Sequence, residues 1–339
     1  MKSVAFHGNQ NVSIVDVPVP EPGPGEVRVR TGMSAICGSE MGVFRGKGLA
    51  TGNPGHEAMG TVDAVGEGVT RVSVGDRVGA SAICGCGAPS CTACQNGQST
   101  WCPQKEFYGN MHAEYFLIAE TGCLPLDSDI PDDVAVLVSG DGLGVPYHTS
   151  LKLRGEDIQR VVVFGLGPIG LGNVLVQAYL GRAVIAVDLV RERLDYARTL
   201  GAAHVVNANT DDVPSAISRL TDGRGADAAI EAAGVARTAK QCFKVVRTNG
   251  LVVFNGEQPA VKLSPSEDFI RRDIRAVGSW FYQVGEFPAM VELVRQGLKV
   301  KNLISHVLTL DQAPEAYDAF VSGKAAKVLL DMHSPPRSG

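Results

Sequence analysis

Residues 161–170 read VVVFGLGPIG, an apolar run typical of a buried strand that leads into three spaced glycines. A helical pattern comes next, and the following apolar run ends at Asp188, about 20 residues further on. Gly165 allows a tight turn, Gly167 lets the backbone approach a pyrophosphate at the helix N-terminus, and Gly170 lets helix and strand pack closely. Strand, glycine turn and helix in this order predict a βαβ unit that binds a dinucleotide.

The acidic residue at the end of the second run bears on which dinucleotide binds. Asp188 can accept hydrogen bonds from both hydroxyls of a ribose, and its charge would repel a 2′-phosphate. The sequence therefore favours NAD over NADP. Arg191 and Arg193 keep NADP open as the alternative, because an arginine near the ribose can meet a 2′-phosphate. The competing interpretation is a glycine-rich turn beside an incidental surface aspartate.

The remainder of the chain shows two different sequence patterns. Residues 1 to about 130 carry short alternating runs punctuated by proline and glycine, which predicts a small, barrel-like β domain. Further on, strand-like runs alternate with helical patterns, which predicts a doubly wound parallel sheet covered by helices, and hence an α/β fold. These runs lie at 161–164, 183–187, 204–206, 227–231, 250–254 and 274–278.

The predicted domain borders follow this change in sequence pattern. We expect the β-rich domain over residues 1–143 and the nucleotide-binding domain over 144–279. Residues 280–339 hold two helical patterns and a final strand at 327–331, and they are expected to return to the first domain. Residues 334–339 are expected to fray.

The composition excludes several classes of protein. Of the 339 residues, 45% are apolar and 20% are charged, which excludes disorder, collagen and coiled coil. A net charge of −5 gives no electrostatic reason to expect nucleic acid or an anionic membrane as a partner. No apolar run approaches the ~18 residues of a membrane span, and no secretory signal is visible. We therefore expect a cytoplasmic, reducing location.

Five of the eight cysteines crowd into one short segment. In a reducing compartment such a cluster predicts metal binding rather than disulfides. Cys91, Cys94 and Cys102 have the spacing of zinc ligands, and Cys86 or Cys84 is available as the fourth thiolate. Four thiolates fill a tetrahedral shell, so the predicted site is structural. The alternative is a set of buried cysteines without metal.

A second set of ligand-type residues is dispersed along the chain. It comprises Cys37, the adjacent pair His56 and Glu57, and Asp141. Each alone is unremarkable, because single cysteines are usually core residues and single histidines usually form hydrogen bonds. Beside a nucleotide site, however, thiolate, imidazole and carboxylate are suited to a catalytic zinc that keeps one position for substrate oxygen.

Several short motifs carry a resemblance to one enzyme family. Residues 37–40 read CGSE, and residues 75–78 read GDRV. Residues 55–60 read GHEAMG, and Gly66 follows. Together with the cysteine lobe at 84–102 and the glycine loop, they resemble the zinc-dependent alcohol dehydrogenases of the medium-chain dehydrogenase/reductase superfamily, essentially end to end. The resemblance implies a GroES-like catalytic domain, a Rossmann nucleotide domain, two zinc ions per chain, and a homodimer or homotetramer.

The resemblance also implies roles around the catalytic zinc. Cys37 and His56 fall at zinc-ligand positions of the family. Glu57 falls where a glutamate binds or approaches the zinc, and Asp141 falls where members carry a further ligand. Ser39 falls where a hydroxyl contacts the substrate oxygen, so it is the implied proton acceptor.

Two further positions match cofactor contacts of the family, and two positions depart from its pattern. Ile169 falls where a branched side chain backs the nicotinamide, and Lys327 falls where a cation approaches the pyrophosphate. Ala88 stands where the first structural cysteine is usual, so Cys86 would have to serve through a longer loop. Gly42 stands where some members end a proton relay with histidine, so a relay here would continue through ribose and water.

The resemblance implies a zinc-dependent oxidoreductase that transfers a hydride between an alcohol and NAD, forming a ketone or aldehyde, and the reverse. A sugar, polyol or cyclitol is the favoured substrate, and a simple secondary alcohol is the alternative. Two other hypotheses are a non-catalytic, zinc-stapled nucleotide sensor and a zinc-free reductase of activated double bonds. The small-molecule substrate is expected to bind in a cleft between the domains. Candidate pocket residues are Tyr108, Asn110, His112, Trp280 and Tyr282.

Overall fold

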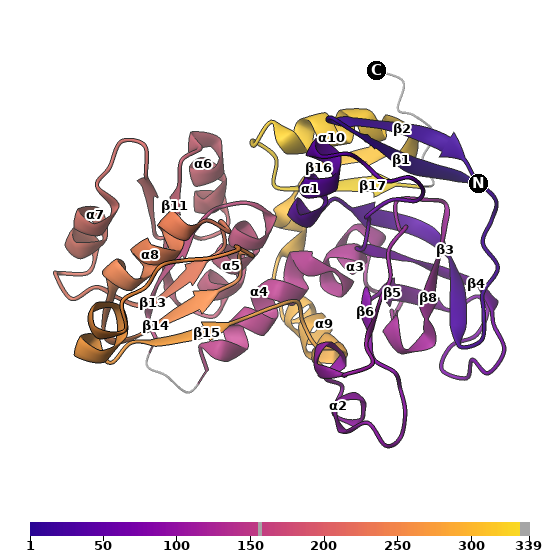
Figure 1. Cartoon of the computed structure of the whole chain (residues 1–339), viewed down its shortest axis with the longest axis horizontal. Coiled ribbons are helices and arrows are strands. Elements are labelled where there is room, and N and C mark those ends of the chain that lie inside the picture. The colour runs from indigo at the N-terminus through magenta and orange to yellow at the C-terminus, as the bar shows by residue number, and fades with distance from the viewer. Residues whose placement is uncertain (155–157, 333–339) are drawn as a thin grey trace. The chain divides into compact units, whose positions relative to one another are not determined.

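The computed structural model describes residues 1–154 and 158–332 (Figure 1). The chain divides into two compact units. Unit 1 comprises Met1–Gly144 and Tyr282–Gly339, and unit 2 comprises Val145–Phe281. The borders expected from the sequence, after residues 143 and 279, lie beside these divisions. The expected fraying of residues 334–339 concerns a segment outside the described ranges.

Unit 2 is built on a six-stranded parallel sheet in the order β12-β11-β10-β13-β14-β15. Residues Val161–Phe164 of its central strand are completely buried, as expected for a parallel sheet that is covered on both faces. The strand runs predicted from the sequence all coincide with strands of this sheet. These strands are β10 (Arg160–Phe164), β11 (Ala183–Asp188), β12 (His204–Asn207), β13 (Ala226–Glu231), β14 (Val246–Phe254) and β15 (Arg275–Gly278).

The helices of unit 2 form two pairs. α5 (Pro168–Tyr179) and α6 (Arg191–Thr199) pack on each other and on β10, β11 and β12. α7 (Val213–Leu220) and α8 (Ala236–Val245) pack on each other, and α8 also packs on β13 and β14. The chain runs from β10 to β11 and β12 through α5 and α6. It then crosses to β13 through α7 and continues to β14 through α8. Right-handed crossovers therefore place the pairs on opposite faces, which is the predicted doubly wound α/β fold.

Unit 1 contains a seven-stranded, mostly antiparallel sheet in the order β16-β17-β3-β4-β5-β9, with β8 also paired to β3. The predicted final strand, Lys327–Asp331, forms β17 and pairs with β3. The strands of this sheet are β3 (Glu26–Ala35), β4 (Ala58–Val65), β5 (Arg77–Ala80), β8 (Tyr115–Ala119), β9 (Cys123–Pro125), β16 (Ile304–Thr309) and β17. Two hairpins complete the unit: β1 (Lys2–Gly8) with β2 (Asn11–Asp16), and β6 (Ile83–Cys84) with β7 (Glu106–Phe107).

Strand β3 organises this sheet because it pairs with three neighbouring strands. Its first half pairs with β8, and its last three residues pair with β17 along the same edge. On the other edge its register with β4 shifts between Thr31 and Met33. Such an irregularity bends and twists a strand. The bend lets one edge of β3 pair with both β8 and β17. Cys37 follows shortly after the end of this strand.

The helices of unit 1 pack on this sheet and on the first hairpin. α3 (Asp132–Ser139) covers β3, β4 and β5, while α10 (Ala313–Val321) covers β2, β16 and β17. The others are α1 (Met41–Arg45), α2 (Thr92–Gln95), α9 (Phe287–Arg295) and α4 (Asp141–Lys152), the last of which continues into unit 2. Short 3₁₀ or π turns are η1 (Gly38–Glu40), η2 (Ser99–Trp101), η3 (Glu120–Gly122), η4 (Pro265–Phe269), η5 (Ile270–Arg272), η6 (Val284–Glu286), η7 (Val300–Leu303) and η8 (Leu310–Gln312). Among the residues described, no helix has both the length and the apolar character needed to cross a bilayer.

Candidate metal and cofactor sites

The dispersed ligand set meets at one point of unit 1. Cys37 precedes η1, His56 and Glu57 immediately precede β4, and Asp141 begins α4. One ligand atom from each of these four residues lies within 4.8 Å of the others. Residues more than 100 positions apart in the sequence thus form a single cluster, and three of the four are buried.

The atoms of this cluster are placed as metal ligands require. The Cys37 thiol and the His56 Nε2 each lie 3.3 Å from Asp141 Oδ2. His56 Nδ1 lies 3.0 Å from the carbonyl oxygen of Pro54, and an N–H that donates there would leave the Nε2 lone pair for a bound metal. Asp141 Oδ1 is buried and has no hydrogen-bond partner among the described residues. The donor set and the unsatisfied oxygen fit a divalent ion.

The electrostatics of the cluster point the same way. Burial and the Asp141 carboxylate both raise the pKa of the Cys37 thiol. Burial opposes a charged His56, yet its hydrogen bonds to Asp141 and Cys37 raise the pKa of the imidazole well above the ordinary value. Burial also raises the pKa of Glu57, against the opposing effect of Lys327. Burial thus opposes the charged forms of Cys37 and Glu57, and a bound cation would favour the thiolate and carboxylate forms that act as metal ligands.

Glu57 has a cationic partner of its own, which changes the prediction for Lys327. The Lys327 side chain is 1% exposed, its ammonium donates to Glu57 Oε1, and it lies 3.5 Å from the Ile36 carbonyl. The other carboxylate oxygen accepts from the Gly142 N–H at 3.3 Å. The interaction of Lys327 in this structure is the ion pair with Glu57, and its contact with a pyrophosphate stays a prediction. Its charge neutralises Glu57, which leaves Cys37, His56 and Asp141 as the more available ligands.

A buried carboxylate that sequence reasoning left without a role supports the Cys37 loop. Glu40 is 1% exposed, and its Oε1 accepts the Cys37 backbone N–H at 2.9 Å. The same carboxylate accepts hydrogen bonds from His112 and Tyr317. Its signal in the sequence was present, because Glu40 is the last residue of the CGSE motif.

The candidate pocket residues separate into two groups. His112 and Tyr282 are completely buried, and the Tyr282 hydroxyl donates to the Ser139 carbonyl, so for these two the pocket prediction is wrong. Tyr108 and Asn110 line a cavity of about 540 Å³ in unit 1. Trp280, in unit 2, is 45% exposed. Large buried aromatic rings and a satisfied buried histidine are core features, which residue type alone does not reveal.

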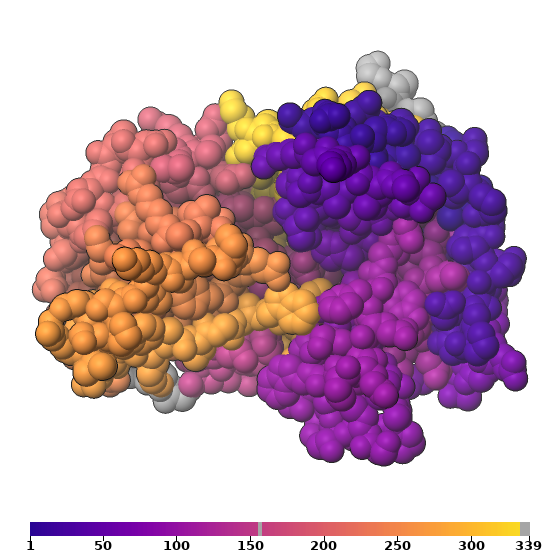
Figure 2. Space-filling view, in the orientation of Figure 1, coloured from indigo at the N-terminus to yellow at the C-terminus, as the bar shows by residue number. Residues whose placement is uncertain are grey.

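The cysteine lobe forms the second cluster, and Figure 2 shows the segment around α2 projecting from the surface of unit 1. The sulfurs of Cys86, Cys91, Cys94 and Cys102 lie within 4.8 Å of one another. Two of the sulfur pairs, Cys86 with Cys94 and Cys91 with Cys102, are 3.8 Å apart. A tetrahedron with zinc–sulfur bonds of about 2.3 Å has edges of about 3.8 Å, so these thiols fit a zinc ion.

The two candidates for the fourth thiolate, Cys84 and Cys86, lie in different surroundings. The Cys84 sulfur lies 3.3 Å from the Ser81 carbonyl, in a buried environment that raises the pKa of the thiol to about 12. It is not part of the cysteine cluster, whereas Cys86 is. The backbone N–H of Cys86 also donates to the Cys102 sulfur at 3.4 Å. The positions of the sulfurs therefore favour Cys86 over Cys84 as the fourth thiolate of the predicted site.

The glycine loop of unit 2 has the geometry that its sequence predicted. Gly165 has φ +83°, and a Cβ there would lie 2.6 Å from Ala233. A Cβ on Gly170 would lie 1.8 Å from the Gly165 carbonyl, so helix α5 could not approach its strand. A Cβ on Gly167 would meet nothing within 4 Å, which leaves the start of α5 open to an anion. Ile169 is half-buried in the first turn of this helix.

Asp188 ends β11 and holds the neighbouring loops. One of its carboxylate oxygens accepts the Leu166 N–H at 2.6 Å, and the other accepts the Leu189 and Val190 N–H groups at 2.7 and 2.9 Å. Arg193 Nη1 is 3.9 Å away, and Arg193 Nε is buried without a hydrogen-bond partner among the described residues. Asp188 thus anchors the glycine loop in addition to its predicted place at the ribose.

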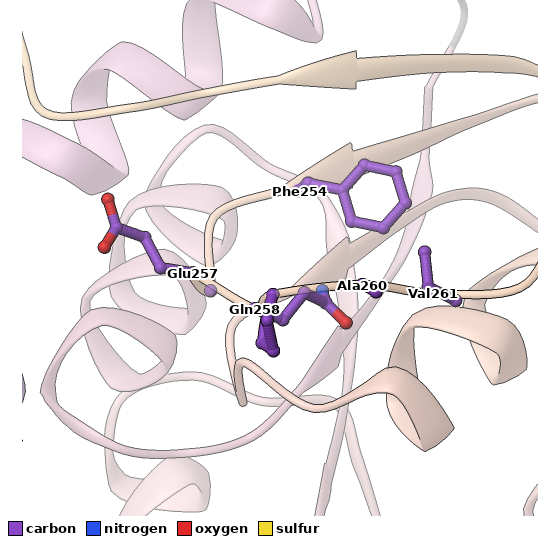
Figure 3. Close-up of a pocket in the computed structure, with 7 residues that line it drawn as sticks. Phe254, Glu257, Gln258, Ala260 and Val261 are labelled. Atoms are coloured by element: carbon purple, nitrogen blue, oxygen red, sulfur yellow. The ribbon is translucent and has the colours of Figure 1, made fainter.

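A cavity of about 770 Å³ lies beside the loop that follows β14 (Figure 3). Figure 3 shows the Phe254 ring facing the part of this loop that carries Ala260 and Val261. The Glu257 side chain points away from that ring. The loop approaches the end of β13 closely, since a Cβ on Gly256 would lie 2.2 Å from the Gly234 nitrogen. Open α/β sheets bind ligands at the carboxyl ends of their strands. Sequence reasoning missed this part of unit 2.

Comparisons with known proteins agree with this geometry. Residues 23–128 match the alcohol dehydrogenase GroES-like domain, and residues 168–296 match the zinc-binding dehydrogenase domain. A sorbitol dehydrogenase of Halalkalibacterium halodurans is 30% identical over 338 residues, covering 96% of each chain. An L-threonine 3-dehydrogenase of Anaeromyxobacter dehalogenans is 30% identical, covering 93% of this chain and 94% of the relative.

A solved structure shows the same likeness in three dimensions. The alcohol dehydrogenase TADH from Thermus sp. ATN1 superposes with a TM-score of 0.88 at 28% identity, covering 98% of this chain and 99% of that one. The β-rich unit, the parallel nucleotide unit and both clusters of ligand-type side chains thus occur in a chain whose relatives match it over nearly its whole length. The chain belongs to the zinc-dependent alcohol dehydrogenases of the medium-chain dehydrogenase/reductase superfamily.

Proposed function

We propose that this protein oxidises a hydroxyl group of a sugar, polyol or cyclitol to a carbonyl with NAD, and catalyses the reverse reaction. The observation that carries the proposal is the meeting of Cys37, His56 and Asp141 at one buried point, with an oxygen of Asp141 left unsatisfied. A zinc-dependent alcohol dehydrogenase needs such a centre in addition to a dinucleotide site. A reductase without zinc, or a simple nucleotide sensor, does not need it.

Each side chain then has a defined task. Cys37, His56 and Asp141 would hold the catalytic zinc, while Lys327 pairs with Glu57 and holds it in place. When bound, the zinc would supply Lewis acidity to the substrate hydroxyl, and NAD would accept the hydride. Ser39 sits at an exposed position in η1, two residues after Cys37, and would take the hydroxyl proton. The thiols of Cys86, Cys91, Cys94 and Cys102 would hold a second zinc that supports folding.

The substrate class is supported by the relatives and not yet by a pocket. One relative is a sorbitol dehydrogenase, which favours a polyol, and another is an L-threonine 3-dehydrogenase. A simple secondary alcohol therefore stays the alternative substrate. The homodimer or homotetramer, the cytoplasmic location and the cleft between the domains stay predictions.

The experiment that tests the function is a screen of NAD reduction together with metal analysis. The panel contains polyols, inositols, aldoses, L-threonine and secondary alcohols, and the protein is purified without chelator. We expect turnover with at least one polyol or sugar and about two zinc ions per chain. Tight NAD binding without turnover on any compound would favour the sensor hypothesis. Turnover by protein with almost no zinc would end the metal hypothesis.

The preference for NAD is tested at Asp188. Asp188→Asn removes the charge but keeps an oxygen that can accept from the glycine loop, whereas Asp188→Ala removes both. Because two like charges near a protein surface repel by several kcal/mol at contact, we expect the asparagine variant to shift the NADP-to-NAD ratio of kcat/KM upward by about 10-fold or more. Kinetics with both cofactors measure this. A wild-type protein that prefers NADP would instead assign the selection to Arg191 or Arg193.

A further inference from the structure

His112 lies between the two loops that carry the first two zinc-ligand residues, although it comes from a third part of the chain. It is in the segment between β7 and β8, and its side chain is 0% exposed. Ring nitrogen Nε2 lies 3.2 and 3.1 Å from the two oxygens of Glu40. Nδ1 lies 2.8 Å from the Ser34 hydroxyl. With Nε2–H as donor and Nδ1 as acceptor of the hydroxyl hydrogen, both nitrogens are satisfied.

Through Glu40 the ring is coupled to the loop of Cys37. The carboxylate oxygen Oε1 that faces His112 also accepts the Cys37 backbone N–H at 2.9 Å. Tyr317 is completely buried and donates its hydroxyl to the other oxygen, Oε2. Three donors thus fix the orientation of one buried carboxylate. Removing the imidazole N–H would leave Glu40 short of a donor, and the Cys37 turn would lose a fixed support.

The same residue is also coupled to the loop of His56. The His112 backbone N–H donates to Asn53 Oδ1 at 3.1 Å, and the Asn53 side-chain amide lies 3.3 Å from the His112 carbonyl. Asn53 Oδ1 also accepts the Gly55 N–H at 3.1 Å. A Cβ on Gly55 would lie 2.5 Å from the imidazole ring, so the ring rests directly on the backbone one residue before His56.

We propose that His112 is a positioning residue that sets the separation of Cys37 and His56 for the catalytic zinc. The inference rests on the proposed function, because it concerns the metal that this function requires. Metal sites tolerate ligand displacements of only about 0.2 Å, and residues that orient ligands typically contribute 10- to 100-fold to metal affinity. The ring contacts both ligand loops: its Nε2–H holds Glu40 against the Cys37 N–H, and its face rests on Gly55, one residue before His56.

The test compares two substitutions in the zinc-loaded protein. His112→Phe keeps a flat ring and removes both nitrogens, whereas His112→Gln keeps a side-chain N–H directed at Glu40. Zinc release to a coloured chelator is followed over time, and the phase that belongs to the Cys37 site is the one missing in His56→Ala. We expect His112→Phe to weaken zinc at this site by about 10- to 100-fold and His112→Gln to weaken it less. The phase from the four-cysteine site is the internal control and should not change.

The outcomes separate this inference from the proposed function. A wild-type protein without the Cys37-site phase would refute the proposed function itself. A normal two-phase wild type with an unchanged His112→Phe variant would refute only the positioning role. Equal acceleration of both phases, together with a lower Tm, would also refute it, because the effect would then be general destabilisation. Should His112→Phe not fold, Ser34→Ala removes only the hydroxyl on Nδ1, and an unaltered Cys37-site phase in that variant would overturn the proposal.

Discussion

Replacing His56 by alanine is expected to empty the Cys37 cluster of metal and to lower turnover by about 10³-fold or more, since Lewis-acid stabilisation is worth several kcal/mol. His56 is the one histidine among the four residues of the cluster. Its loss removes the imidazole ligand beside Cys37 and Asp141, whose side chains are too few to hold the ion by themselves. Zinc analysis should therefore fall by one ion per chain and not by two.

A matched control separates this effect from the mere loss of a histidine. His306→Ala removes an exposed imidazole from β16 of the same unit. It should keep both ions and normal turnover. NAD binding should be unchanged in both variants, because the glycine loop belongs to unit 2. Full zinc content in His56→Ala with turnover close to that of the wild type would show that the cluster is not the catalytic centre.

Removing the hydroxyl of Ser39 should have the second largest effect. Ser39→Ala is expected to lower kcat by ~10²–10⁴-fold, the usual contribution of a positioned acid–base group. The side chain is exposed in the η1 turn, two residues after the buried Cys37, so it is open to a substrate and is not needed for packing. Zinc content, NAD affinity and Tm should therefore remain close to the wild-type values.

The conservative variant sharpens the test. Ser39→Thr keeps a hydroxyl at the same position and should recover most of the lost kcat, whereas Ser39→Ala should not. A deuterated substrate shows whether hydride transfer limits the rate in each variant. If Ser39→Ala turns over as fast as the wild type while chemistry is rate-limiting, water takes the proton and Ser39 has no acid–base role.

Local patterns were sufficient for much of the fold. The spacing of glycines in residues 161–170 and the alternation of strand and helix patterns predicted the parallel sheet, because each βαβ unit is specified by contiguous residues. The final strand at 327–331 was predicted correctly for the same reason. The cysteine lobe was also visible, since three of its ligands, Cys91, Cys94 and Cys102, lie on one short stretch of chain.

The resemblance to family motifs predicted contacts that residue spacing alone did not predict. Nothing in the sequence separation of Cys37, His56 and Asp141 shows that they meet, and only their match to family motifs predicted one cluster. The structure then brought their ligand atoms within 4.8 Å of one another. The residue types were informative because a thiol, an imidazole and a carboxylate that converge out of water need a common positive partner.

Other features were decided only by tertiary structure. Cys84 and Cys86 are two residues apart, yet the backbone turns one sulfur toward Ser81 and the other toward the cysteine cluster. Lys327 matched a cofactor contact by position, but strand pairing of β17 with β3 places its ammonium against Glu57. A buried charged side chain forms an ion pair with the nearest opposite charge, and the fold determines which group is nearest.

The sequence by itself thus determined the two kinds of domain, the dinucleotide loop and the composition of both ligand sets, because these are encoded in contiguous segments or in residue types. It did not determine the surroundings of those ligands. His112 looked like a pocket residue, and only the packing of the β7–β8 segment against the loops of Cys37 and His56 shows it as their common support. Hydrogen bonds between residues far apart in the chain carry no local signal, because each partner alone is compatible with many environments.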